Sequence, residues 1–142
     1  MTQEDKELLL KYLCMALPSG VICEDMEGKT RPLFGITPTQ HFIVTLDNAT
    51  DGTNGLKYCT IDCIKPYLRP MSSMTDEERN EYNNLYYQVS INVDNNGNTF
   101  RDMKILEWLH ISWFLKNHFD FMGLIEKGLA LEAPEEMYKH IV

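Results

Sequence analysis

Residues 64–75 read Ile-Lys-Pro-Tyr-Leu-Arg-Pro-Met-Ser-Ser-Met-Thr, and this stretch separates two different sequence patterns. Each proline fixes its own φ and disfavours the α region at the residue before it, so Lys65 and Arg69 are predicted to be extended. Short β-type runs and glycine-rich turns precede the stretch, whereas helical periodicity dominates after it. We therefore expect a stiff, extended strap that ties a small sheet to a helical layer and ends at a helix cap.

The composition is that of an ordinary globular protein. A length of 142 residues with 44% hydrophobic and 24% charged residues predicts a single domain, 1–142, with a core of its own. The net charge of −8 opposes direct binding to nucleic acid, which depends on Lys and Arg contacts to phosphates. It favours solubility or a basic partner.

The sequence also predicts a cytoplasmic location. The N-terminus lacks the basic region and apolar run of a signal peptide, and no stretch approaches the roughly 20 apolar residues of a membrane span. The four cysteines, Cys14, Cys23, Cys59 and Cys63, are then expected to be reduced and packed as small apolar residues rather than joined in disulfides.

An N-terminal helix and several short strands are predicted before the strap. Thr2 and Asp5 resemble a capping box for a helix within residues 1–17, and the sequence Pro18-Ser19-Gly20 ends it. Residues 18–71 contain four or five short strands, the clearest over residues 41–46, and a single helical turn just before the strap. This order favours a small, strongly bent β-barrel of the Src-homology or Tudor type, with Pro32 and Gly35 marking an edge or a bulge.

Residues 72–142 are predicted to form the helical layer of an α+β fold. Thr75 and Glu78 make a second capping box, for a helix to about Tyr87. The apolar spacing predicts that this helix buries Tyr82, Leu85, Tyr86 and Val89. A turn at residues 94–98 either closes a hairpin or leads into the next helix, over residues 102–117. The remaining tail contains Pro134, which can start a short helix.

The helix over residues 102–117 is apolar on two sides. Ile105, Leu106, Leu109 and Trp113 form one stripe, and Trp108, Ile111 and Leu115 form a second. Such a helix is buried on both sides, so the second stripe is covered either by the tail or by another chain. We therefore select five candidate partner-contact residues, three on this stripe and two in the strap: Trp108, Ile111, Leu115, Tyr67 and Arg69.

Three segments resemble a known family: residues 64–75, the run Asn117-His-Phe-Asp120 continuing into 123–138, and the turn at residues 17–21. They are similar to a family of short proteins without an established activity from gut anaerobic bacteria and their integrated phages. Met122 and Ser19 depart from the family pattern, which has a charged and an aromatic residue there. The resemblance implies an origin in a phage or other mobile element and an accessory or host-modulating role, and it transfers no catalytic residues.

Metal sites are disfavoured by the spacing of the candidate ligands. Cys59-x-x-x-Cys63 lacks the tight spacing and the second ligand pair of a structural zinc site. Loops beginning at Asp47 and Asp94 resemble calcium loops, but their twelfth positions are Tyr58 and Ile105 rather than Glu. We predict no metal or cofactor site. The Asp, Asn and Gly residues of both loops are those that favour tight turns.

No catalytic signature is present either. His110 or His118 could pair with a cysteine in space, but no local signature supports such a pair, and no phosphate loop, zinc-protease motif or nucleophile elbow occurs. An aromatic cage is conceivable from Tyr58, Tyr67, Phe34 and Phe42, although such residues more often fill a barrel interior.

The leading hypothesis is a non-enzymatic accessory protein acting by protein–protein contact, with a homodimer through the helix around Trp108 as one form. One alternative is an acidic regulator that mimics nucleic acid toward a basic host factor. The other is a small hydrolase using Cys63 or Cys59.

Overall fold

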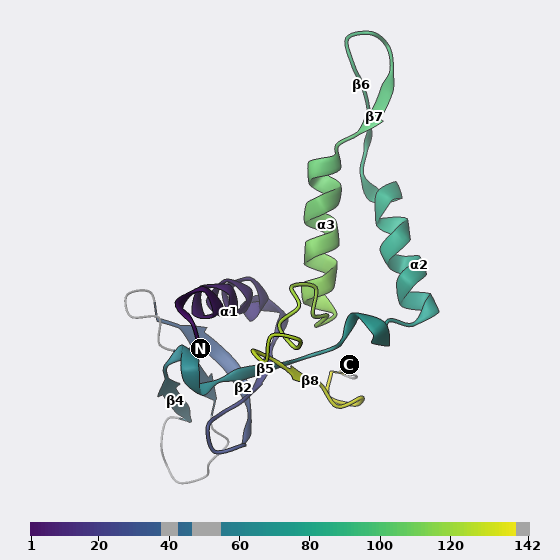
Figure 1. Ribbon diagram of the computed structural model, residues 1–142. Helices are drawn as coiled ribbons and strands as arrows, with labels where there is room; N and C mark the ends of the chain where they lie inside the picture. The colour runs from purple at the N-terminus through teal and green to yellow at the C-terminus, as the bar shows by residue number, and fades with distance from the viewer. Residues whose placement is uncertain (38–42, 47–54, 139–142) are drawn as a thin grey trace.

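The computed structural model describes residues 1–37, 43–46 and 55–138, and the chain has two parts (Figure 1). The body contains helix α1 (Gln3–Ala16), a six-stranded sheet and much of the tail. An arm made of two helices and a hairpin projects away from the body. The mixed α+β class predicted from the sequence is confirmed.

Helix α1 begins at the predicted capping box. The Thr2 hydroxyl accepts a hydrogen bond from the Asp5 N–H at 3.0 Å, and the Asp5 carboxylate accepts one from the Thr2 N–H at 3.4 Å. The helix covers the sheet with one apolar face. Its fully buried residues are Leu9, Tyr12, Leu13 and Ala16.

The sheet has the strand order β4-β3-β2-β1-β5-β8. Neighbouring strands are antiparallel from β4 to β5, and β8 joins β5 in parallel. The register of β2 and β3 shifts between Leu33 and Gly35, which confirms the predicted irregularity in this strand. The strands are β1 (Ile22–Glu24), β2 (Thr30–Ile36), β3 (Ile43–Leu46), β4 (Leu56–Cys59), β5 (Lys65–Leu68) and β8 (Leu131–Glu132).

Three predictions for this region reach beyond what the structure tests. The strand expected to begin at His41 is described only from Ile43 onward, and the loop beginning at Asp47 lies outside the described residues as far as Asn54. Closure of β1–β5 into a barrel also stays a prediction. The observed strand order gives the neighbours of each strand within the sheet and does not include a pairing that closes it.

The strap is extended from Ile64 to Pro70 and central, as predicted, whereas Met71–Ser73 form a 3₁₀ turn in place of extended chain. Ile64, Pro66 and Leu68 are buried, while β5 pairs with β1 on one side and β8 on the other. Beyond β5, the Arg69 N–H donates to the His118 carbonyl at 2.7 Å. The strap therefore fastens the sheet to the residues that follow the last helix.

The arm runs from α2 (Asp76–Asn84) through the 3₁₀ turn η4 (Leu85–Gln88) and the hairpin β6 (Ile91–Val93) and β7 (Thr99–Arg101) to α3 (Met103–Lys116). The capping box of α2 is confirmed, with a 3.1 Å bond from the Glu78 N–H to the Thr75 hydroxyl. Residues 94–98 close a hairpin, so the hairpin reading of that turn is confirmed.

The predicted burial of Tyr86 is wrong. The α-helix ends at Asn84 and tightens into η4, which rotates later side chains away from the α-helical stripe. Tyr86 is consequently 40% exposed, whereas Leu85 and Val89 are buried as predicted.

The tail lacks the predicted short helix but covers part of α3, as expected. Residues 134–137 form a turn closed by the Met137 N–H and the Pro134 carbonyl, rather than a short helix. The tail does cover part of the second stripe of α3, because Leu115 and Ile111 pack with tail residues Leu124 and Leu129. Strand β8 was not predicted.

Candidate functional site

The arm carries most of the exposed large apolar side chains of the described chain. Thirteen such residues are exposed in the described ranges, and eight of them lie within residues 86–108. Scattered exposed apolar residues are normal, but a concentration in one element marks an interaction site. We define the arm surface as these eight side chains: Tyr86, Tyr87, Ile91, Val93, Phe100, Met103, Ile105 and Trp108.

The two helices of the arm are well packed against each other near the body, although the arm surface is exposed. At the base of the arm, the Tyr82 ring stacks on His110 at 4.2 Å and on Phe114 at 5.0 Å. The Trp113 indole N–H donates to the Glu81 carboxylate at 2.9 Å, and this tryptophan is buried. The aromatic side chains near the body are thus packed against one another, whereas the apolar side chains of the arm surface lie farther out and are exposed.

The β6–β7 hairpin at the end of the arm is open on all sides. Every residue from Ser90 to Phe100 is exposed. Ile91 and Val93 point to the same face of the hairpin because alternate residues of a strand share a face. Two-stranded hairpins are marginal in water unless further strands or a helix cover them.

The segment that carries the arm surface, residues 86–108, is nearly neutral in a strongly acidic chain. Residues 86–108 contain three acidic and two basic residues, a net charge of −1, so the rest of the chain carries −7 of the total −8. Contact between two copies of the body would be opposed by like charge. Contact through residues 86–108 of two copies would meet much less of this repulsion.

The structure separates the three candidate contact residues of the second stripe. Trp108 is 64% exposed and belongs to the arm surface. Leu115 is buried, and Ile111 is partly buried, in the cluster shared with α1 and the tail. The second stripe of this helix is therefore buried at its C-terminal end and exposed at Trp108.

The two candidates in the strap serve internal contacts. The Tyr67 hydroxyl donates to the Glu24 carboxylate at 3.0 Å. The Arg69 guanidinium makes two 2.7 Å bonds to the Glu78 carboxylate and lies 4.1 Å from the centroid of the Phe119 ring. These hydrogen bonds lower the pKa of Glu78 to about 2.

A cavity of about 660 Å³ lies beside the strap, between the start of α2, the end of α3 and the tail. Its walls have both signs of charge, from Arg69, Lys116 and Glu132 among others. His118 lines it and is buried in a left-handed backbone conformation, φ 62°, with its ring stacked 3.7 Å from Tyr138. Burial, with a smaller effect of the Arg69 charge, lowers the pKa of His118 to about 4.

The aromatic residues considered for a cage are not gathered inside the sheet. Phe34 on β2 and Tyr58 on β4 are 56% and 60% exposed, so the expectation that they fill a barrel interior is wrong. Both stand at positions where the alternation of a strand turns the side chain outward. Phe42 lies outside the described residues.

The candidate metal ligands form no site in the part of the chain that the structure describes. No group of three or more His, Cys, Asp or Glu side chains lies close enough there to hold an ion. The described loop at Asp94 is a turn, since its carboxylate accepts 2.9 Å bonds from the N–H groups of Asn96 and Asn98. Within the same described ranges, no helix is long and apolar enough to cross a membrane.

All four cysteines are free thiols with different exposures. Cys14 is exposed, Cys23 is buried, and Cys59 and Cys63 are intermediate. Burial raises the pKa of Cys23 and of Cys59. The burial of Cys23 and Cys59 is opposite to the electropositive, exposed setting of a reactive cysteine.

This difference predicts an order of alkylation. With iodoacetamide at neutral pH, Cys14 should be modified first, Cys59 more slowly, and Cys23 only after unfolding, because the thiolate is the reacting form. Peptide mass spectrometry over time gives each rate, and urea-unfolded protein provides the reference. Modification of Cys59 or Cys63 faster than of the same residue in the unfolded chain would restore the hydrolase hypothesis.

Sequence reasoning missed the hairpin as part of the candidate surface. The available signal was the run from Tyr82 to Val93, which contains no charged residue in a chain that is 24% charged. It also missed the cavity beside the strap, because the cavity is built from three segments distant in sequence.

Comparisons with protein-family models, with curated proteins and with solved structures give no match.

Proposed function

We propose that the protein acts by protein–protein contact and that the arm surface binds a second copy of the chain. The observation that carries this proposal is the concentration of eight exposed apolar side chains within residues 86–108. Aromatic residues such as Tyr87 and Trp108 contribute strongly to interfaces when they become buried. The near neutrality of the same segment favours an identical acidic chain as the occupant.

A double substitution on the arm tests this proposal. Replacing both Tyr87 and Trp108 by glutamate removes the two most exposed aromatic side chains of the arm surface, 71% and 64% exposed, and places charges there. The dissociation constant of the dimer should rise by about 30-fold or more, because loss of an aromatic hot spot costs about 2 kcal/mol. Sedimentation equilibrium over a range of concentrations measures it.

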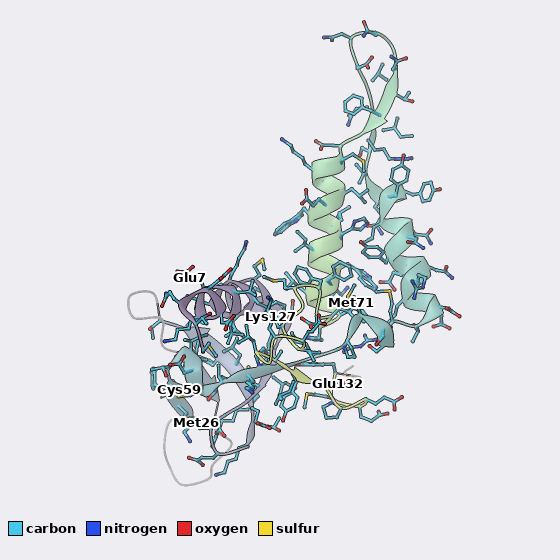
Figure 2. All side chains as sticks on the ribbon, in the orientation of Figure 1. Glu7, Met26, Cys59, Met71, Lys127 and Glu132 are labelled. Carbon is cyan, nitrogen blue, oxygen red and sulfur yellow. The ribbon has the colours of Figure 1, made fainter. Side chains whose placement is uncertain are left out.

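Met26→Glu combined with Tyr58→Glu is the matched control. These side chains are 78% and 60% exposed, but they belong to the body, and Figure 2 labels Met26 on the side of the body away from the arm. The control should associate as the natural chain does. A natural chain that stays monomeric at every concentration, or equal losses in both double variants, would contradict arm-mediated association.

The acidic surface outside residues 86–108 favours a second candidate, a regulator that docks on a basic factor. The exposed carboxylates that motivate it lie in three helix-proximal groups, including Glu4 and Glu7, Asp76 and Glu77, and Glu135 and Glu136. Such docking would weaken as salt rises and would be indifferent to replacement of the apolar side chains of Tyr87 and Trp108. A pull-down at low and high salt with the arm variant separates the two candidates.

Two finer features complete the proposal. Residues 18–71 are proposed to close into a small barrel of the Src-homology or Tudor type, supported by the order β4-β3-β2-β1-β5 and by the single 3₁₀ turn η2 (Ile61–Cys63) between β4 and β5. An accessory protein of a phage or other mobile element, working in the cytoplasm, is the proposed setting; the free thiols are compatible with it.

A further inference from the structure

The outer edge of β6 offers unpaired backbone groups to another strand. Residues Ile91, Asn92 and Val93 pair with Arg101, Phe100 and Thr99 of β7, and the hairpin is a separate two-stranded sheet. The opposite edge of β6 has no neighbouring strand among the described residues. All three residues of β6 are exposed.

The hydrogen bonds of the turn identify which groups point outward. The Asp94 N–H donates to the Asn98 carbonyl at 2.9 Å, so these two residues form a hydrogen-bonded pair. Hydrogen-bonded and non-hydrogen-bonded pairs alternate along an antiparallel ladder, which makes Asn92 and Phe100 the next bonded pair. The N–H and C=O groups of Ile91 and Val93 therefore face the open edge.

The open edge of β6 lacks the features that prevent an edge strand from pairing with a strand of another chain. Natural edge strands are protected by charged side chains, prolines or bulges, and β6 has none of them. The other edge of the hairpin is different, because β7 contains Arg101, whose guanidinium lies 4.6 Å from the Tyr86 ring. Of the two edges, β6 is the one suited to pairing.

We propose that β6 of one copy pairs antiparallel with β6 of a second copy about a two-fold axis at Asn92, forming a four-stranded intermolecular sheet. A two-fold axis between identical strands requires the antiparallel arrangement and makes the interface self-complementary. With this register, Ile91 stands opposite Val93 of the second copy, and all outward N–H and C=O groups of β6 find partners. A shift to either side would leave some of them without a partner in β6.

The pairing also accounts for the side chains of β6. It brings the Ile91 and Val93 side chains of both copies together on one face, and cross-strand pairs of β-branched residues stabilise sheets. It converts a marginal two-stranded hairpin into four strands. No charged residue of either β6 enters the contact. This inference rests on arm-mediated association and specifies its register.

A cysteine at the axis tests the register directly. In a Cys14→Ser background, which removes the exposed natural thiol, Asn92→Cys should form a disulfide between copies under mild oxidation. Residues facing each other in a non-hydrogen-bonded pair have Cα atoms about 4.5 Å apart, within disulfide range. Ser90→Cys in the same background is the control and should stay unlinked, because its counterpart is displaced by four residues along the sheet. Equal cross-linking of both, or none at Asn92→Cys in a dimeric protein, would overturn the register.

Two proline variants test the edge. Val93→Pro removes an outward N–H of β6, and Thr99→Pro removes an outward N–H of β7, while neither touches a bond within the hairpin. Val93→Pro should be monomeric at concentrations where Thr99→Pro and the natural chain are dimeric, with circular dichroism confirming that each is folded.

The outcomes separate the two proposals. If Val93→Pro stays dimeric while the Tyr87 and Trp108 double variant dissociates, β6 pairing is wrong and arm-mediated association stands. If Thr99→Pro alone dissociates, the pairing edge is β7 and the inference is wrong. If the natural chain is monomeric throughout, both proposals fail.

Discussion

Replacing Phe119 by alanine is expected to lower the free energy of unfolding by about 4 kcal/mol, within the range measured for truncation of buried phenylalanines. Phe119 is fully buried, where the strap meets the base of the arm. Its ring stacks on Trp113 at 5.5 Å and receives the Arg69 guanidinium at 4.1 Å from its centroid. The truncation would leave a cavity beside both groups, and neighbouring backbone bonds to Arg69 limit how far the site can collapse.

Urea denaturation at neutral pH, at protein concentrations too low for association, measures this effect. Phe34→Ala is the matched control, because Phe34 is 56% exposed on β2 and loses little packing; a change of about 0.5 kcal/mol or less is expected for such a surface position. Comparable losses in both variants would mean that residue 119 is no more buried than residue 34. That result would remove the described connection between the strap and the arm.

Local chemistry in the sequence determined much of the fold. The capping residues Thr2 and Thr75 identify the starts of α1 and α2, and the prolines at 66 and 70 identify the extended strap. These features depend on neighbouring residues alone. The hairpin turn at residues 94–98 has the same local character, since Asp94 satisfies its own turn amides.

Features that depend on distant partners were harder to predict. Strand β8 comprises two residues and exists because β5 offers an edge at Tyr67 and Leu68. The exposure of Tyr86 follows from a change of helix type that the apolar spacing does not reveal. The cavity beside the strap requires α2, α3 and the tail to meet, which no segment encodes alone.

The candidate site was predicted only in part, for a related reason. The two apolar stripes of α3 identified a helix with more apolar surface than one neighbour can cover. Spacing along a helix does not reveal where the covering tail ends, so Leu115 and Trp108 looked equivalent. The exposure of Trp108 follows from the projection of the arm beyond the body (Figure 1).

The free energy of unfolding should fall by about 3 kcal/mol between pH 7 and pH 4 because of His118. The pKa of this side chain is about 4 in the folded chain, against 6.5 for an ordinary histidine, because burial disfavours the charged ring. As the pH falls from 6.5 to 4, the unfolded chain binds this proton and the folded chain does not, so acid favours unfolding. Each unit of pKa difference corresponds to about 1.36 kcal/mol.

The upper part of this pH window isolates His118 from the shifted carboxylates. The pKa values of Glu78 and Asp25 are lowered from 4.5 and 3.8, so their contributions to stability are lost only as the pH falls below these values. Urea unfolding at steps from pH 7 to pH 4.5 therefore reports mainly on the histidine. The free energy should change little between pH 7 and pH 8, where the His118 ring is neutral in both states.

His118→Asn is the control variant, because asparagine tolerates the left-handed conformation that residue 118 adopts, φ 62°. It removes the titrating ring and loses the stacking on Tyr138, so its stability at pH 7 should be lower. Its stability should then vary less than that of the natural chain between pH 6.5 and pH 4.5. Parallel pH dependences in the two proteins would mean that the His118 ring accepts a proton in the folded chain as readily as in water, and that this ring is not enclosed between Tyr138 and the strap.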